Sequence, residues 1–268
     1  MMRIFAVLLS WTALLTTAVA QSGSTSPKSD ATKMPNQVFE LRTYTLIDEN
    51  AEQKLDSYLE NALVPALERQ GLGPIGVFDQ ASKPQDGTIE VMLLIPGPST
   101  EAVTSAAGKL TNDKEYQAAA RDYMNTPANE PVVQRIRSEL LLAFDCWPQV
   151  TVPSQKEGNQ PRLFELRTYE SPTEQFGALK VEMFNAGEVP IFLDSKITPV
   201  FMGQALIGDM MPNLTYMTVF DNDQARQAGW DAFRSSPDWK VLSGIEKYKG
   251  TVNKIHKSDW VPKSFSRL

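Results

Sequence analysis

The six residues FELRTY stand at positions 39–44 and recur unchanged at positions 164–169 of the 268-residue chain. Self-similarity at a fixed separation is the signature of a repeated structural unit. Val64-Pro65 returns as Val189-Pro190 at the same separation of 125 positions. Six consecutive identities followed by a second match indicate an internal duplication, with two copies of one unit rather than a long array.

The two copies are predicted to form two domains, over residues 38–148 and 162–268. Between Val77-Phe78 and Val200-Phe201 the separation falls to 123 positions, which a loop shorter by two residues in the second copy explains. The segment 149–161 is polar and contains prolines, so we interpret it as the linker.

Each copy has the same expected order of elements. In the first copy, residues 38–46 favour a strand, and apolar residues at helical spacing over 55–67 favour a helix that Pro65 interrupts. The remaining elements are a hairpin (75–79 and 88–95), a helical region after Ser99 and a strand (139–147). In the second copy they are a hairpin (197–207 and 214–220), a helix capped by Asp221 or Asn222, and a short last strand, because the copy ends at 264–268.

This β-α-β-β-α-β order is that of a ferredoxin-like unit, whose helices cover one face of its sheet. The other face must be buried as well. We therefore expect an α+β fold in which two tandem ferredoxin-like domains pack sheet to sheet as an intramolecular α+β barrel.

Alternation along a strand divides each hexamer between two faces. Phe39, Leu41 and Thr43 share one face, which we expect to pack on a neighbouring layer. The opposite face carries a carboxylate, a guanidinium and a phenol in each copy: Glu40, Arg42 and Tyr44 in the first, and Glu165, Arg167 and Tyr169 in the second. One interpretation is a buried ion pair that fixes strand register. The other is a ligand pocket for an anion or a carbonyl, with arginine as the anchor and tyrosine as the donor.

Residues 1–20 are typical of a signal peptide. Arg3 precedes a short apolar run, and Ala18-Val19-Ala20 fits a cleavage site after Ala20. Residues 21–37 are polar and are predicted to be a disordered tether. We therefore expect a periplasmic or secreted protein that has no membrane segment after signal cleavage.

Composition excludes several kinds of chemistry. The net charge of −6 becomes −7 without Arg3, which argues against a nucleic-acid partner. A single cysteine, Cys146, excludes an internal disulfide, and we interpret it as a buried apolar residue. His256 is the only histidine, so a haem ligand there is a minor alternative to a surface or hydrogen-bonded histidine. We predict no metal and no cofactor.

Three further patterns have ordinary structural explanations. The methionines Met202, Met210, Met211 and Met217 suggest core packing or a turn more than a copper site. Trp230, Phe233 and Trp239 follow helical spacing and suggest a core stripe. The acidic stretch 221–223 is interpreted as a helix cap rather than as metal ligands.

The chain resembles the NIPSNAP family in its hexamer, in the Val-Pro of the first helix and in the SSPDW sequence at 235–239. The first copy departs from the resemblance, because it has NDKEY at 112–116 instead. The resemblance implies the dimeric α/β-barrel superfamily, which includes cofactor-free monooxygenases and haem-binding relatives. It implies no settled catalytic residues.

We therefore expect an exported NIPSNAP-family protein that acts by binding or interaction and is not an enzyme, and no catalytic residues are assigned. The alternative is a cofactor-free monooxygenase-like enzyme that acts on a small aromatic or quinone-like substrate between sheet and helices. The expected partners are a small apolar or anionic ligand, or another protein. The expected assembly is a monomeric pseudo-dimer or a homo-oligomer.

Overall fold

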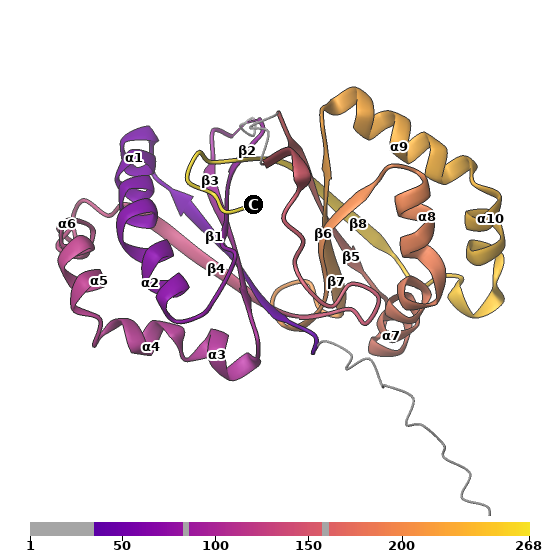
Figure 1. Cartoon of the computed structure of the whole chain (residues 1–268), viewed down its shortest axis with the longest axis horizontal. Coiled ribbons are helices and arrows are strands. Elements are labelled where there is room, and N and C mark those ends of the chain that lie inside the picture. Colours follow the sequence, from indigo (N-terminus) through magenta and orange to yellow (C-terminus); the bar gives the residue numbers. More distant parts are fainter. Residues whose placement is uncertain (1–34, 83–85, 157–160) are drawn as a thin grey trace, which may run out of the picture. The chain divides into compact units, whose positions relative to one another are not determined.

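The repeated hexamers lie in two strands of one closed eight-stranded barrel (Figure 1). The structure, a computed structural model, describes residues 35–82, 86–156 and 161–268. The predicted signal peptide and residues 21–34 of the predicted tether lie outside these ranges. Met34–Leu268 forms one structural unit.

The first half of this unit has the expected order of elements. Strand β1 (Val38–Leu46) matches the predicted strand residue for residue. The other elements of the first half are α1 (Glu49–Tyr58), η1 (Leu59–Leu63), α2 (Val64–Arg69), β2 (Gly76–Gln80), β3 (Ile89–Gly97), α3 (Thr100–Thr104), α4 (Ala106–Leu110), α5 (Lys114–Ala119), α6 (Arg121–Met124) and β4 (Val133–Ala143).

The second half repeats that order. Its strand β5 (Leu163–Glu170) contains the second hexamer, and Asn222 caps helix α9 through a bond from the Ala225 N–H. The other elements of the second half are η2 (Ser154–Lys156), α7 (Glu174–Met183), η3 (Phe184–Glu188), α8 (Val189–Asp194), β6 (Thr198–Ile207), β7 (Asn213–Phe220), α9 (Asp223–Ser235), α10 (Pro237–Gly244), η4 (Glu246–Tyr248) and β8 (Lys254–Pro262).

The strands follow one another around the barrel as β1-β3-β2-β8-β5-β7-β6-β4, and neighbouring strands are antiparallel. Two short seams join the halves. One pairs β2 with β8 from Phe78↔Pro262 to Gln80↔Trp260, and the other pairs Leu140–Ala143 of β4 with β6. The packing is therefore a closed barrel rather than two open sheets laid face to face.

The barrel interior is built by the Phe/Leu face of both hexamers. Phe39 and Leu41 belong to the same buried cluster as Phe164, and Leu166 packs against it. The Phe39 and Phe201 rings have centroids 5.3 Å apart, so residues from the two halves meet inside the barrel. The neighbouring layer that the sequence predicted for the Phe/Leu face is therefore the sheet of the other half of the chain.

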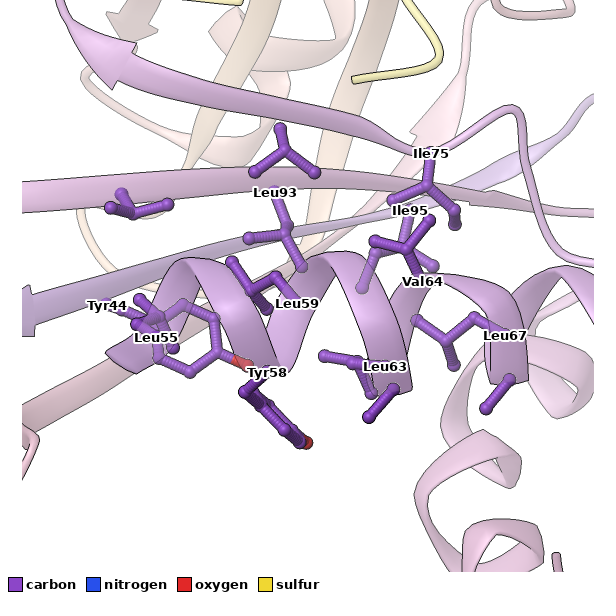
Figure 2. Packing of buried hydrophobic residues seen from close by; sticks show 14 of the residues in the cluster. Tyr44, Leu55, Tyr58, Leu59, Leu63, Val64, Leu67, Ile75, Leu93 and Ile95 are labelled. Atoms are coloured by element: carbon purple, nitrogen blue, oxygen red, sulfur yellow. The ribbon is translucent and has the colours of Figure 1, made fainter. Parts of the chain in front are cut away.

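The opposite face of the sheet packs against helices. Figure 2 shows Leu55, Leu59 and Leu63 of α1 and η1 beside Leu93 and Ile95 of β3, with Tyr44 and Tyr58 at one end of the row. The interruption predicted at Pro65 is a π-helical turn at Leu59–Leu63, after which α2 begins with proline in its first turn. Pro190 has the same place in α8, after η3.

Two expectations about strand ends are wrong. The last strand is not short, because β8 runs for nine residues and pairs with β5 from Phe164↔Trp260 to Glu170↔Lys254. Strand β4 ends at Ala143, so Cys146 lies in the following turn and is only half-buried. Its backbone N–H donates to Asn185 Oδ1 at 2.9 Å.

The described ends of the tether and of the linker are bonded to the barrel. The Gln37 N–H donates to the Pro148 carbonyl, and the Thr151 N–H donates to the Val200 carbonyl, each at 2.8 Å. In the described residues, no helix combines the length and the apolar character that crossing a membrane requires.

Candidate functional site

The first hexamer holds a closely bonded charge pair. Arg42 donates from Nε to Glu40 Oε1 at 2.7 Å and from Nη2 to Glu40 Oε2 at 2.9 Å. Ser138 of β4 donates to the same carboxylate at 2.6 Å. Burial by itself lowers the pKa of Arg42, but Tyr44 and Glu40 raise it by more than burial lowers it. The guanidinium therefore stays protonated, and the Glu40 carboxylate balances its charge.

A cavity of about 560 Å³ lies between this part of β1 and helices α1, α4, α5 and α6. We call it the phenol cavity, because Arg42 and four tyrosines line it: Tyr44, Tyr58, Tyr116 and Tyr123. Met124 and Ile136 also line it, and they are 63% and 54% exposed. They give the cavity an apolar opening to solvent.

The tyrosines of the phenol cavity form two groups, Tyr44 with Arg42 and Tyr58 with Tyr116 and Tyr123. Arg42 Nη1 donates to Tyr44 OH at 3.3 Å, and the Tyr58 and Tyr116 hydroxyls are 3.0 Å apart. The Tyr58 and Tyr123 rings stack with centroids 3.9 Å apart. Burial raises the pKa of Tyr44, of Tyr58 and of Tyr123, the last to about 12. At neutral pH these phenols are therefore hydrogen-bond donors and not bases.

The second hexamer has the same residues in a looser arrangement. Arg167 Nη1 lies 3.5 Å from Glu165 Oε1, while Glu165 Oε2 accepts a 2.5 Å bond from Trp230 Nε1. The guanidinium of Arg167 lies 4.1 Å above the Trp230 ring. Its Nε is buried and has no hydrogen-bond partner. Glu40 binds Arg42 with both of its oxygens, whereas the matching carboxylate of this half, Glu165, is shared between Arg167 and Trp230.

Tyr169 belongs to a buried polar network rather than to a cavity wall. Its hydroxyl is 2.7 Å from that of Tyr216, and Lys180 Nζ nearby donates to Glu188 Oε2 at 2.6 Å. The sequence interpretation missed Lys180, Glu188 and Tyr216. A comparison of the copies position by position contains the signal, because Leu55, Leu63 and Leu93 stand at the matching positions of the first half.

A second cavity, of about 740 Å³, adjoins Arg167. We call it the basic cavity. It lies where β8 leaves β2, beside helix α9. Its charged lining comprises Arg137, Arg167, Arg226, Arg234 and Lys257, with the acids Glu90, Glu165, Asp231 and Asp259. The two hexamers thus line two different cavities, one through Arg42 and Tyr44 and one through Glu165 and Arg167.

The other residues that the sequence singled out lie in the core, in a turn or in a hydrogen bond. His256 is hydrogen-bonded to Glu170 and lines neither cavity. Met202 and Met217 are buried, while Met210 and Met211 lie in the turn between β6 and β7. The predicted core stripe is confirmed by Trp230, Phe233 and Trp239, which pack together in one cluster. Within the described ranges, no group of three or more His, Cys, Asp or Glu side chains is placed to hold a metal ion.

A closed α+β barrel with helices outside and cavities between sheet and helices defines the structural class of the dimeric α+β barrels. Residues 164–267, in the second half of the chain, match the NIPSNAP family model. The comparison with curated proteins found no match.

Two solved structures, both with TM-scores above 0.5, support this fold. A candidate monooxygenase from Fusobacterium nucleatum aligns with 7% identity over 85% of this chain and 93% of that chain, with a TM-score of 0.55. One from Lactobacillus acidophilus aligns with 12% identity over 85% and 94% of the two chains, with a TM-score of 0.52. An uncharacterized NIPSNAP-like domain protein from Burkholderia xenovorans matches 39% of this chain and 88% of its own, with 15% identity and a TM-score of 0.36.

Proposed function

We propose that the protein binds a small, planar, uncharged aromatic molecule in the phenol cavity and acts by binding rather than by catalysis. The observation that carries this proposal is a cavity of about 560 Å³ lined by four tyrosines and by an arginine already neutralised by Glu40. That volume is within the range of small-molecule pockets.

The charge of the cavity favours an uncharged ligand. A ligand anion would compete with Glu40, which already makes two charge-assisted bonds to Arg42. What remains for a ligand is donor capacity on Nη1 of Arg42, on the hydroxyls of the tyrosines, and on Arg121, which also lines the cavity but is exposed, so that solvent screens its charge. A carbonyl or phenol oxygen fits these donors, and the stacked Tyr58 and Tyr123 rings offer an aromatic face.

Calorimetric titration with 2-naphthol, 1-tetralone and 1-naphthoate tests this proposal. We expect the two uncharged probes to bind at least tenfold more tightly than 1-naphthoate, since a charged bond lost or gained is worth about 1.5–3 kcal/mol. Equal or tighter binding of 1-naphthoate would contradict the proposal.

A blocking variant locates the bound probe. Ala107 is exposed and lines the cavity, so Ala107→Trp is expected to abolish binding without disturbing the core. Ala118→Trp is the matched control, because Ala118 is exposed on α5 but lines no wall of the cavity. Undiminished binding by Ala107→Trp would place the ligand elsewhere.

A second candidate is a cofactor-free monooxygenase-like activity on a quinone-like substrate. Arg42 Nη1 and Tyr44 OH together are suited to stabilise the oxyanion formed when such a substrate loses a proton to solvent from a ring CH2 group conjugated with its carbonyl. The reaction converts a ring CH2 group and O2 into a carbonyl and water. Oxygen uptake with anthrone, compared between the wild type and Ala107→Trp, distinguishes it from binding alone.

Export belongs to the same proposal. The signal-like residues 1–20 support cleavage after Ala20 and a periplasmic or secreted location. Cell fractionation with N-terminal sequencing of the mature protein tests it, and an intact Met1 in the cytoplasmic fraction would contradict it.

A further inference from the structure

Arg167 and Lys257 form an unusual pair of like charges. They lie directly opposite each other on β5 and β8, and both line the basic cavity. Residues opposite each other in an antiparallel pair have Cβ atoms about 4.5–5.5 Å apart, and like charges there are destabilising. In the first half, Ser138 lies opposite Arg42 and donates to Glu40. The second half therefore brings a second cation to the place where the first half has a hydroxyl.

Neither cation of this pair is fully neutralised by the protein. Arg167 is 8% exposed, its Nε lacks a partner, and its contact with Glu165 is 3.5 Å long. In the described part of the chain, the Lys257 ammonium takes part in no ion pair or hydrogen bond. A buried guanidinium with an unsatisfied N–H donor destabilises the fold, and a bound anion would remove that penalty by accepting the hydrogen bond.

The other arginines of the basic cavity already have acidic partners. Arg226 bonds to Asp259, Arg234 bonds to Asp231, and Arg137 lies 3.5 Å from Glu139. An incoming anion would have to displace those carboxylates. Arg167 is paired with Glu165 at the same 3.5 Å, but its Nε has no partner, and in the described residues Lys257 has no acidic partner, so these two groups offer an anion donors without displacing a carboxylate. Glu90 of β3 also lines the cavity, and its negative charge disfavours a ligand that carries several negative charges.

The basic cavity also has apolar walls. Trp230 lines it on the face of Arg167 and Lys257, while Met92, Leu166 and Trp260 line it on the inner face of the sheet. A volume of about 740 Å³ exceeds what a bare carboxylate fills, so the space fits an anionic head with an apolar body. The cavity is accessible because the pairing of β8 with β2 stops at Gln80↔Trp260 and one backbone bond from the Ala81 N–H to the Asp259 carbonyl, so that Lys254 to Ser258 pair with β5 alone.

We propose that the basic cavity binds a small organic anion, with its carboxylate or phosphate held between Arg167 and Lys257 and its apolar body against Trp230, which lines the cavity on the same face of the sheet. This site is separate from the phenol cavity and uses none of its residues.

Calorimetric titration with phenylacetate and phenyl phosphate tests the proposal, with 2-phenylethylamine and benzyl alcohol as cationic and uncharged controls. We expect phenylacetate to bind at least tenfold more tightly than either control, and binding to weaken as the salt concentration rises. The ratio of phenylacetate to phenyl phosphate affinity identifies the preferred head group. Equal affinity for phenylacetate and benzyl alcohol would overturn the proposal.

Variants assign the site. Lys257→Met is expected to weaken phenylacetate binding about tenfold or more while raising the melting temperature, because it removes the like-charge contact. Lys254→Met, on the same strand but outside the cavity, is expected to bind within twofold of the wild type. Unchanged binding by Lys257→Met would overturn the proposal. Loss of phenylacetate binding in Ala107→Trp would overturn it too, because the anion would then occupy the phenol cavity.

Discussion

The buried pair of Lys180 and Glu188 gives a sharp test of how the two halves differ. Their side chains are 5% and 2% exposed, and the nitrogen and oxygen are 2.6 Å apart. Leu55 and Leu63 stand at the matching positions of the first half. We expect Glu188→Leu alone to destabilise the fold by about 3–5 kcal/mol, because it leaves the Lys180 ammonium buried without a counter-charge.

The double variant Lys180→Leu, Glu188→Leu should behave differently. It recreates the leucine pair of the first half, and a buried ion pair replaced by apolar groups is often neutral or stabilising by about 1–4 kcal/mol. For a unit of this length, about 2–4 °C of melting temperature corresponds to 1 kcal/mol. The single variant should therefore melt about 6–20 °C lower, and the double variant at the wild-type temperature or above.

Urea unfolding followed by tryptophan fluorescence measures these changes, and Trp239 is a suitable reporter because its ring lies 5.5 Å from Lys180 Nζ. The wild type, the single variants Lys180→Leu and Glu188→Leu, and the double variant together give the coupling free energy between the two side chains. Glu182→Leu is the control, since Glu182 is half-exposed and pairs with Lys247 at the surface, where an ion pair contributes little. A double variant as unstable as the single one would refute the reasoning.

Three further predictions concern other buried groups. Trp230→Phe removes the donor to buried Glu165 and should cost about 1–3 kcal/mol by urea unfolding; no loss would mean that the bond contributes nothing. Burial raises the pKa of Tyr44, Tyr58 and Tyr169, so the unfolded chain ionises first near pH 10; stability should be full below that pH and fall as the pH rises above it, and a flat urea midpoint between pH 9 and 11 would contradict this. Burial raises the pKa of the Cys146 thiol from 9.0 to about 11, so iodoacetamide at pH 8 should alkylate the folded protein about 100-fold more slowly than the unfolded protein, and equal rates would contradict this.

The order of elements was predictable because it depends on local patterns. The alternation in FELRTY assigns Phe39 and Leu41 to one face and Arg42 to the other, and the structure places them inside and outside the barrel. The proline after Val64 marked the change of helix type. The length of β8 was not predictable from the same patterns, because pairing with β5 rather than apolar content keeps Lys254 to Asp259 in a strand.

The cavities were not predictable, because tertiary packing forms them. Nothing near Arg42 in the sequence indicates that Tyr116 and Tyr123, on separate short helices, face it across a cavity. The two interpretations of the hexamer both describe the molecule in part. Arg42 has the geometry of the ion pair, while Arg167 has the unmet donor that the pocket interpretation needs.

The presence of both hexamers in one barrel has an evolutionary consequence. In a barrel assembled from two identical chains, every substitution appears twice, once on each side of the symmetry axis. Here a change at Glu188 leaves Leu63 untouched, and a lysine at position 257 leaves Ser138 in place. Each half is therefore free to diverge under its own selection, and a change harmful to one cavity can be kept when it improves the other.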